Sequence, residues 1–246
     1  MLSEQRHEII LKMLEEKRSV TVTELTEHLG ISESTARRDI TILDKAGKLV
    51  KVFGGAVLSD GAYQSVEPTV TQKVEINREE KKKIAEYAAS LILPQDFVYL
   101  DAGTTTGYML DFIGETGATF VTNAVAHAQR LAAKGAHVLL VGGTLKSSTE
   151  AVVGTMAALI LKDYHFSKGF FGANGVSKAA GFTTPDANEA LVKRTALEQC
   201  RKAYILCDNS KFHIVSSVTF APFSAGTILT DARPEEYAGA ANIVLC

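Results

Sequence analysis

The sequence predicts an α/β protein with a small helical domain at the N-terminus and a larger domain with a mainly parallel sheet. Three observations support this prediction. The 246 residues exceed the roughly 150 of an average domain. The first 58 residues show helical periods separated by turn signals. From residue 96 onward, short apolar runs alternate with helix-like stretches, as in βαβ units.

The composition is that of a soluble globular protein. Apolar residues make up 46% of the chain and charged residues 22%, so a disordered chain is excluded. Nothing approaches 18 consecutive apolar residues, and the first eight residues are too polar for a signal peptide. The three cysteines form no C-x-x-C pair. We expect a reduced, cytoplasmic protein with no membrane association.

The first 58 residues are predicted to form a winged helix-turn-helix. Residues 4–17 place Ile9, Ile10, Met13 and Leu14 on one face of a helix. Thr23 is the expected cap of a second helix over 24–29, which Gly30 ends, and Ser32 caps a third helix that runs to about residue 46, before Gly47. Residues 49–52 and 56–58 around Gly54 and Gly55 predict a hairpin, the wing.

The third helix and the wing carry a local excess of positive charge. Residues 35–58 hold five Lys or Arg and two Asp, although the whole chain has a net charge of −2. Hydroxyls and arginines on such a helix suit a major groove and its phosphates. The candidate DNA-binding residues are Thr23, Ser32, Ser34, Thr35, Arg37, Arg38, Thr41, Lys45 and Lys51. A solvated helix face, or a three-helix module that binds protein, is the alternative at this point.

Residues 59–77 are the expected linker between the domains. They are polar, contain Gly61 and Pro68, and show no sustained period. A helix is predicted next, over 78–93, and its lysines 81–83 are expected to form a solvated face. The second domain is therefore expected to span 78–246.

Seven strands are predicted for this second domain. They are Phe97–Leu100, Thr119–Val121, Val138–Val141, Gly169–Phe171, Tyr204–Cys207, Thr227–Leu229 and Ile243–Leu245. The helix-like stretches between them are Thr105–Ile113, Ala124–Lys134, Thr155–Lys162, Asn188–Cys200 and Pro234–Ala240. Parallel strands joined in this way bind ligands beyond their carboxyl ends.

Glycine and small polar residues follow several of these strands. The loop D-A-G-T-T-T-G at 101–107 precedes a helix, so its backbone amides and threonine hydroxyls favour an anion. Lys193 and Lys211 are the candidate cations for a phosphorylated ligand, and Asp101 is expected to bind sugar hydroxyls. The full set of candidate effector-binding residues is Asp101, Gly103, Thr104, Thr105, Thr106, Asn123, Gly142, Gly143, Asn174, Glu189, Lys193, Asp208 and Lys211. Taken alone, the 101–107 loop is also compatible with an ordinary glycine turn.

Motifs for cofactors and for several kinds of catalysis are missing. The sequence has no G-x-G-x-x-G after a strand, no P-loop, no G-x-S-x-G elbow and no metal spacing among its six histidines. We therefore expect no cofactor, no metal and no catalytic residues.

Two groups of motifs resemble the DeoR family of transcriptional regulators. The run from Val20 to Ala56, with S-E-S-T-A-R-R-D-I and G-G-A, resembles the family's DNA-binding domain. The motifs D-A-G-T-T-T, T-N-A, G-A-N-G-V-S, G-F-T-T-P-D and D-N-S-K-F resemble its C-terminal sensor, which shares a fold with ribose-5-phosphate isomerase. The resemblance implies a sugar-phosphate pocket, and it is strongest to the branch of fructose-operon and lactose-operon repressors.

The resemblance predicts the partners and leaves one rival function. We expect a repressor that binds double-stranded operator DNA as a homo-oligomer, dimer or tetramer, under the control of a phosphorylated sugar such as fructose 1-phosphate or tagatose 6-phosphate. The rival is an isomerase-like enzyme with an accessory DNA-binding domain. The isomerases carry a D-G-A-D-E loop where this chain reads F-G-A-N-G at 171–175. The loss of those acids favours a sensor, because isomerisation needs a general base. A scaffold that does not bind DNA is a third class.

Overall fold

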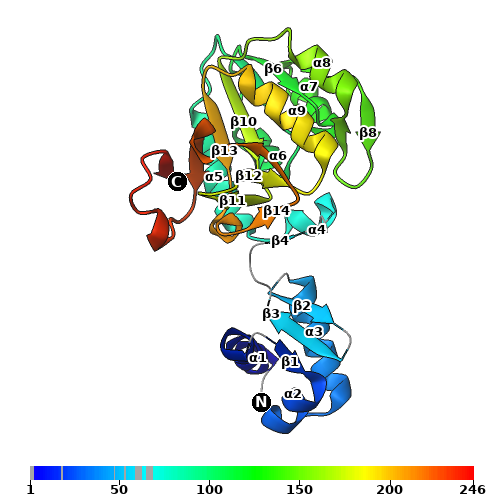
Figure 1. Cartoon of the computed structure of the whole chain (residues 1–246). Helices are drawn as coiled ribbons and strands as arrows, with labels where there is room; N and C mark the ends of the chain where they lie inside the picture. Colours follow the sequence, from blue (N-terminus) through cyan, green and yellow to red (C-terminus); the bar gives the residue numbers. More distant parts are fainter. Residues whose placement is uncertain (1–2, 18, 47, 53, 59–62, 65–68) are drawn as a thin grey trace. The chain divides into compact units, whose positions relative to one another are not determined.

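The chain divides into two compact units, Met1–Tyr63 and Gln64–Cys246. The computed structural model, drawn in Figure 1, describes residues 3–17, 19–46, 48–52, 54–58, 63–64 and 69–246. Each unit is described separately below.

The N-terminal unit has three helices and a three-stranded antiparallel sheet of order β1-β3-β2. The elements are α1 (Ser3–Lys17), β1 (Ser19–Thr21), α2 (Val22–Leu29), α3 (Glu33–Lys45), β2 (Leu49–Val52) and β3 (Gly55–Leu58). Ile10, Leu14, Leu25, Ile40 and Leu49 fill its core. The helices and the wing are confirmed, and the short strand β1 before α2 pairs with β3. Gly47 lies outside the described residues.

The cap of α2 differs from the expectation. Thr21, not Thr23, is the N-cap. The amide of Glu24 donates to Thr21 Oγ1 at 3.1 Å, and the amide of Thr21 donates to Glu24 Oε2 at 2.8 Å. This reciprocal pair satisfies two helix-end donors together, which a cap at Thr23 could not do with Glu24. The predictions for Gly30, which has a left-handed φ of 63°, and for Ser32, which accepts from Thr35 N, are confirmed.

The C-terminal unit is built on a seven-stranded parallel sheet of order β17-β16-β13-β10-β5-β6-β7. The seven strands are the seven that the sequence predicted: β5 (Phe97–Leu100), β6 (Thr119–Thr122), β7 (His137–Leu140), β10 (Lys168–Gly172), β13 (Ala203–Leu206), β16 (Thr227–Thr230) and β17 (Ile243–Leu245). The chain builds outward from β5 to β7, then returns to β10 and builds in the other direction. The strand order therefore reverses between β5 and β10.

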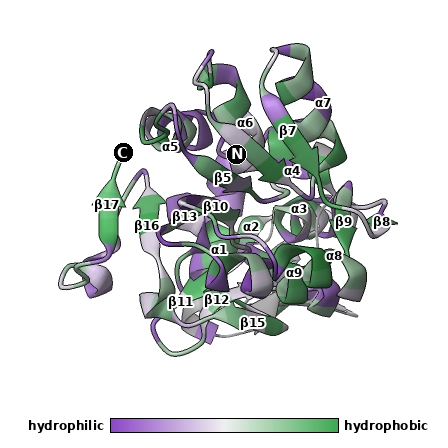
Figure 2. Cartoon of the chain, turned by 90° about the horizontal axis from the view of Figure 1, so that it is seen from above, coloured by the Kyte–Doolittle hydropathy of each residue, from purple (hydrophilic) through white to green (hydrophobic). Residues whose placement is uncertain are grey.

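Helices cover both faces of this sheet. The five long ones are α5 (Arg78–Ser90), α6 (Thr104–Phe112), α7 (Val125–Ala133), α8 (Thr155–Leu161) and α9 (Ala187–Glu198). One buried cluster joins α5, α6 and α7 to Val98, Leu100 and Phe120. A second joins α8 and α9 to Tyr99 and Phe171. Because alternate residues of a strand point to opposite faces, Val98 and Tyr99 belong to different clusters. Figure 2 shows β17 in the green of apolar residues.

Several small elements were not predicted. They are β4 (Tyr63–Gln64), α4 (Val70–Val74), the hairpin of β8 (Thr144–Lys146) and β9 (Ala151–Val153), the antiparallel sheet of β11 (Gly175–Ser177), β12 (Gly181–Thr184) and β15 (Val218–Ala221), and β14 (Val215–Ser216). The α4 helix lies inside the expected linker, of which residues 59–62 and 65–68 are outside the described part. The prediction of a helix over Pro234–Ala240 is wrong. The chain there forms only a short 3-10 turn, η3 (Glu235–Tyr237), which resembles η1 (Asn209–Lys211) and η2 (Phe223–Ala225) in length. None of the helices in the described ranges has the length and apolarity needed to cross a membrane.

Candidate functional site

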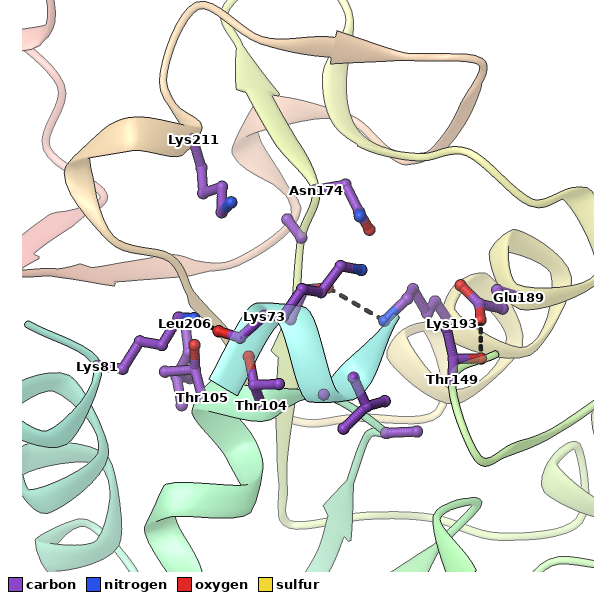
Figure 3. Close-up of a pocket in the computed structure, with 15 residues that line it drawn as sticks. Lys73, Lys81, Thr104, Thr105, Thr149, Asn174, Glu189, Lys193, Leu206 and Lys211 are labelled. Atoms are coloured by element: carbon purple, nitrogen blue, oxygen red, sulfur yellow. Dashed lines mark hydrogen bonds between the residues drawn. The ribbon is translucent and has the colours of Figure 1, made fainter. Parts of the chain in front are cut away.

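A pocket opens where the strand order reverses, beyond the carboxyl ends of β5 and β10. This is the position at which open α/β sheets bind ligands. The residues that line it come from the loops after both strands, from α4, α5, α9 and η1, and from the start of α6, the turn between β8 and β9 and the end of β13. Figure 3 draws them: Val70, Lys73, Lys81, Ala102, Gly103, Thr104, Thr105, Thr149, Gly172, Ala173, Asn174, Glu189, Lys193, Leu206 and Lys211.

The loop after β5 presents the start of α6 to the pocket. The first bond within this helix runs from Gly107 N to Gly103 O at 2.9 Å, so the amides before it belong to the turn that an α-helix leaves without internal acceptors. Gly103, Thr104 and Thr105 line the pocket with these groups. Thr106 points the other way, is fully buried, and donates to Asp101 O at 2.7 Å. It fixes the loop rather than lining the cavity.

Asn123 supports the same loop from behind. Its Oδ1 accepts from the amide of Ala102 and from the hydroxyl of Tyr99, both at 3.0 Å, and its Nδ2 donates to Val152 O at 3.0 Å. The side chain is 3% exposed and does not line the pocket. Asn123 therefore positions the Ala102 backbone, which does line it.

A buried ion pair forms the floor of the pocket. Lys193 Nζ, from α9, donates to Asp101 Oδ2 and also to Gly172 O at 3.2 Å, while Gly172 N donates to Asp101 Oδ2 at 3.0 Å. Burial raises the pKa of Asp101, and the Lys193 ammonium opposes that rise. Asp101 is 1% exposed, bonds Lys193 and Gly172 N, and is not among the residues that line the pocket, so it holds Lys193 in place where the sequence had suggested a contact with the sugar.

Glu189 provides the acidic wall. Its Oε1 accepts from Thr149 Oγ1 at 2.6 Å and from Lys146 Nζ at 3.2 Å, and Thr184 Oγ1 lies 3.3 Å from Oε2. Thr184 also donates to Asn174 Oδ1 at 3.2 Å. This wall offers an acidic acceptor and an amide, which is the chemistry that hydroxyl groups of a sugar require.

Three further lysines gather on the opposite wall. Lys73 belongs to α4, Lys81 to α5 and Lys211 to η1. The prediction that Lys81 lies on a solvated face is wrong, because Lys81 is 3% exposed. Its burial lowers its pKa to about 8, with Lys211 and Lys73 acting in the same direction and Asp208 and Glu80 against it.

Asp208 stands behind these lysines. It is 1% exposed, and its Oδ1 accepts from Asn77 Nδ2 at 2.8 Å and from Ser210 N at 3.1 Å. Its Oδ2 is buried and has no hydrogen-bond partner in the described part of the chain. Four lysines and one glutamate line the pocket, and even with Asp101 and Asp208 behind them a positive charge remains. Such a cavity favours an anion.

The predicted effector residues thus separate into three groups. Those that line the pocket are Gly103, Thr104, Thr105, Asn174, Glu189, Lys193 and Lys211. Those that support it from behind are Asp101, Thr106, Asn123 and Asp208. Gly142 and Gly143 are not among the lining residues; both lie in the exposed turn between β7 and β8. Lys73, Lys81 and Thr149 also line the pocket and were not predicted.

The predicted DNA-binding residues lie on α3, at the ends of α2 and α3, and on the wing. Arg37 and Arg38 are exposed, and Arg37 is 3.3 Å from Glu33 one turn earlier. Lys51 Nζ on β2 donates to Thr41 Oγ1 at 3.0 Å, which ties the wing to α3. Ser32, Ser34 and Thr35 form a hydroxyl cluster at the start of α3, and Thr23 is exposed in the first turn of α2. The Lys45 side chain lies outside the described residues.

The third residue of the R-R-D motif faces the interior. Asp39 is 1% exposed and accepts from Arg6 Nε at 2.6 Å and from Arg6 Nη2 at 3.0 Å, with His7 Nε2 at 3.3 Å. Burial alone would raise the pKa of Asp39, but the bonds from Arg6 and His7 outweigh it and leave that pKa lowered. This pair fixes α3 against α1, so that the two arginines beside it point outward.

Comparison with known proteins identifies both units. Residues 6–61 match the DeoR-like helix-turn-helix domain, and residues 76–232 match the DeoR C terminal sensor domain. The chain belongs to the DeoR family of transcriptional regulators. This DeoR-family chain is 43% identical to the uncharacterised regulator FruR of Bacillus subtilis over 237 residues, 96% of this chain and 93% of FruR. It is 33% identical to the lactose phosphotransferase system repressor of Streptococcus mutans over 240 residues, 96% and 95% of the two chains.

These relatives agree with the fructose and lactose branch that the motifs predicted, and they resolve the choice between sensor and isomerase. A DeoR-family helix-turn-helix and sensor make the chain a regulator, not an enzyme. Among solved structures, ribose 5-phosphate isomerase A from Methanocaldococcus jannaschii has a TM-score of 0.42 and 15% identity, over 55% of each chain.

Proposed function

We propose that this chain represses a sugar-utilisation operon by binding its operator, and that a phosphorylated sugar in the pocket controls that binding. The observation that carries the proposal is the composition of the pocket: four lysines and a helix start face one carboxylate. Helix N-termini and lysines bind phosphate, and Glu189 with Asn174 suits the hydroxyl groups of the same ligand. Fructose 1-phosphate and tagatose 6-phosphate are the candidates that the resemblance to fructose-operon and lactose-operon repressors implies, and a lactose phosphotransferase system repressor is among the relatives.

The pocket residues take separate parts in this proposal. Gly103, Thr104 and Thr105 offer backbone amides and hydroxyls to the phosphate, together with the lysines. Glu189 and Asn174 receive the sugar. No group of three or more His, Cys, Asp or Glu in the described ranges is placed to hold a metal ion, so the proposal uses only the chain's own groups.

On the DNA side, we infer that the start of α3 enters the major groove. Ser32, Ser34 and Thr35 suit phosphates or base edges, and Arg37 and Arg38 suit guanine or phosphates. Thr23, Thr41, Lys45 and Lys51 supply further contacts to the backbone of the duplex. A homo-oligomer, dimer or tetramer, would present paired domains to half-sites about one helical turn or a multiple apart.

The effector half of the proposal is tested by a thermal-shift screen of phosphorylated sugars with the full chain. A ligand at 100 times its dissociation constant stabilises the folded state by about 2.7 kcal/mol. Fructose 1-phosphate and tagatose 6-phosphate are compared with unphosphorylated fructose and tagatose. A shift with the phosphorylated sugars only is expected. An equal shift with the free sugars, or none with any sugar phosphate, would overturn the assignment of the pocket.

The DNA half is tested with variants of α3. Arg37→Ala and Arg38→Ala should each weaken binding to a duplex selected by the wild-type chain by at least tenfold. The matched control is Arg201→Ala, an exposed arginine of the sensor unit. Equal losses in all three variants, or none, would contradict the assigned surface. Binding of the wild-type chain that does not weaken with added salt would contradict phosphate contacts altogether.

A further inference from the structure

The α4 helix forms one wall of the pocket. It spans Val70–Val74, and both Val70 and Lys73 line the cavity. Figure 3 shows Lys73 extending from this helix among the labelled pocket side chains. In the sequence, α4 comes between the DNA-binding unit and the rest of the sensor. A ligand that contacts α4 therefore contacts the segment that continues into the DNA-binding unit.

The position of α4 depends on its tertiary contacts. A five-residue helix is not stable by itself in water, even with the cap that Thr69 and Gln72 provide. Tyr108 Oη donates to Val74 O at 3.0 Å, Val70 N donates to Ser148 O at 3.3 Å, and Lys81 Nζ donates to Lys73 O. Loss of these bonds would release the helix.

Each of those contacts comes from an element of the pocket. Tyr108 lies on α6, whose first turn lines the cavity, and Ser148 precedes the lining residue Thr149. Lys81 lines the cavity itself while its ammonium bonds the α4 carbonyl. Lys81 therefore both lines the pocket and holds α4, and the other two bonds come from neighbours of lining residues.

Electrostatics links occupancy of the pocket to this arrangement. Lys73 and Lys211 line the same pocket as Lys81 and their charges act on it, and like charges in a part-buried site repel one another. An anion between them removes that repulsion only while α4 is in place. It therefore binds the arrangement with α4 docked more tightly than one with α4 released, which is the condition for coupling.

We propose that Lys73 binds the anionic effector directly and that α4 transmits the occupancy of the pocket to the DNA-binding unit. This inference rests on the proposed function, since it needs an anionic effector. Lys73 is a ligand-contact residue, and Tyr108 is a positioning residue that acts through α4.

Two variants test the two parts, with fructose 1-phosphate and tagatose 6-phosphate as the probes. Lys73→Gln should weaken binding of the better probe to the DNA-free full chain by at least tenfold in calorimetric titration. The control Lys83→Gln, an exposed lysine of α5, should stay within twofold. Binding of the Lys73 variant within twofold of wild type would overturn the contact.

The second variant separates transmission from binding. Tyr108→Phe removes the hydroxyl that bonds Val74 O and leaves the lining residues in place. Its affinity for the probe should stay within threefold, whereas the ratio of operator affinities with and without the probe should fall to less than a third of the wild-type ratio. Tyr87→Phe, at an exposed tyrosine of α5, should keep the full ratio. A full ratio in the Tyr108 variant would overturn the role of α4.

Failure of the proposed function gives a different result. In that case the wild-type chain itself would bind neither probe, or its operator affinity would not change on binding. Either result overturns both proposals, whereas intact wild-type coupling with unaffected variants overturns only the role of α4 and Lys73.

Discussion

Replacing Lys193 by alanine should destabilise the sensor unit as well as abolish effector binding. Lys193 and Asp101 are 5% and 1% exposed, and the pair sits under the pocket. Without the ammonium, the Asp101 carboxylate loses its cationic partner and, among the bonds of the described residues, keeps that from Gly172 N at 3.0 Å. Removing one member of a buried ion pair typically costs about 3–5 kcal/mol. We expect a loss of that size in the free energy of unfolding at pH 8.

The loss should depend on pH in a defined direction. Burial already raises the pKa of Asp101, and without Lys193 that pKa rises further. Above the ordinary pKa of an aspartate and below the raised one, the folded variant holds a proton that the unfolded chain has released. Its stability then falls as pH increases, by at most about 1.4 kcal/mol per pH unit. The deficit relative to wild type should therefore be smaller at pH 5 than at pH 8.

Urea unfolding of the full chain, followed by far-ultraviolet circular dichroism at both pH values, measures this. The double variant Asp101→Asn with Lys193→Ala removes the unpaired charge, so at pH 8 it should recover at least about 2 kcal/mol of the loss. Equal deficits at the two pH values, together with no recovery in the double variant, would refute the role assigned to the pair. The double variant is also the better background for asking whether Lys193 binds effector, because its effect on folding is smaller.

Three further predictions concern other parts of the molecule. Binding of fructose 1-phosphate should weaken as pH rises through about 8, because Lys81 loses its proton there. Calorimetric titration from pH 6.5 to 9.5 measures this decline. A decline that persists unchanged in Lys81→Arg would contradict the role of Lys81. Asp39→Ala should destabilise the N-terminal unit by about 2–4 kcal/mol in scanning calorimetry. A double-mutant cycle with Arg6→Ala should give a coupling energy of at least about 1 kcal/mol between the two residues. Simple additivity of the two substitutions would contradict the Arg6–Asp39 pair. Gly55→Ala should lower the free energy of unfolding by more than about 2 kcal/mol, because the added Cβ would lie 2.1 Å from Val20 O. The control Gly239→Ala has open space around it and should change stability little. Equal effects of the two substitutions in the same calorimetry would contradict the close approach at Gly55.

The sequence predicts the central sheet well because each of its strands is a short apolar run beside a helical period. Tyr99, Phe171 and Ile205 lie in such runs and are fully buried. The antiparallel strands β11, β12 and β15 were missed for the opposite reason. They are rich in glycine and threonine, and β12 pairs with β15 across more than thirty residues of chain. β11 and β12 form a local hairpin, but the pairing of β12 with β15 is non-local, and no local pattern reveals it.

The pocket was predicted only where it follows strand ends. Thr104 and Asn174 follow strand ends in this way, whereas Lys193 lies in α9 and was predicted as a cation for a phosphorylated ligand. Lys73 and Lys81 were missed because a lysine in a polar run gives no local sign of burial; whether it is buried depends on what packs against it. The true cap at Thr21 was readable, because T-x-x-E with Glu24 at the third position signals a capping box.

The sources of the pocket lysines explain how the fold can act as a sensor. Lys193 comes from α9 and is neutralised by Asp101, so it is part of the permanent structure. Lys73, Lys81 and Lys211 come from three other elements, and Asp208, which bonds Asn77 and Ser210, and Glu80 act on the charge of Lys81 from nearby. The mutual repulsion of these three lysines opposes the docked position of α4, and an anion removes it. The ligand thus completes the electrostatics of its own site, and the element it stabilises most is the one that continues into the DNA-binding unit.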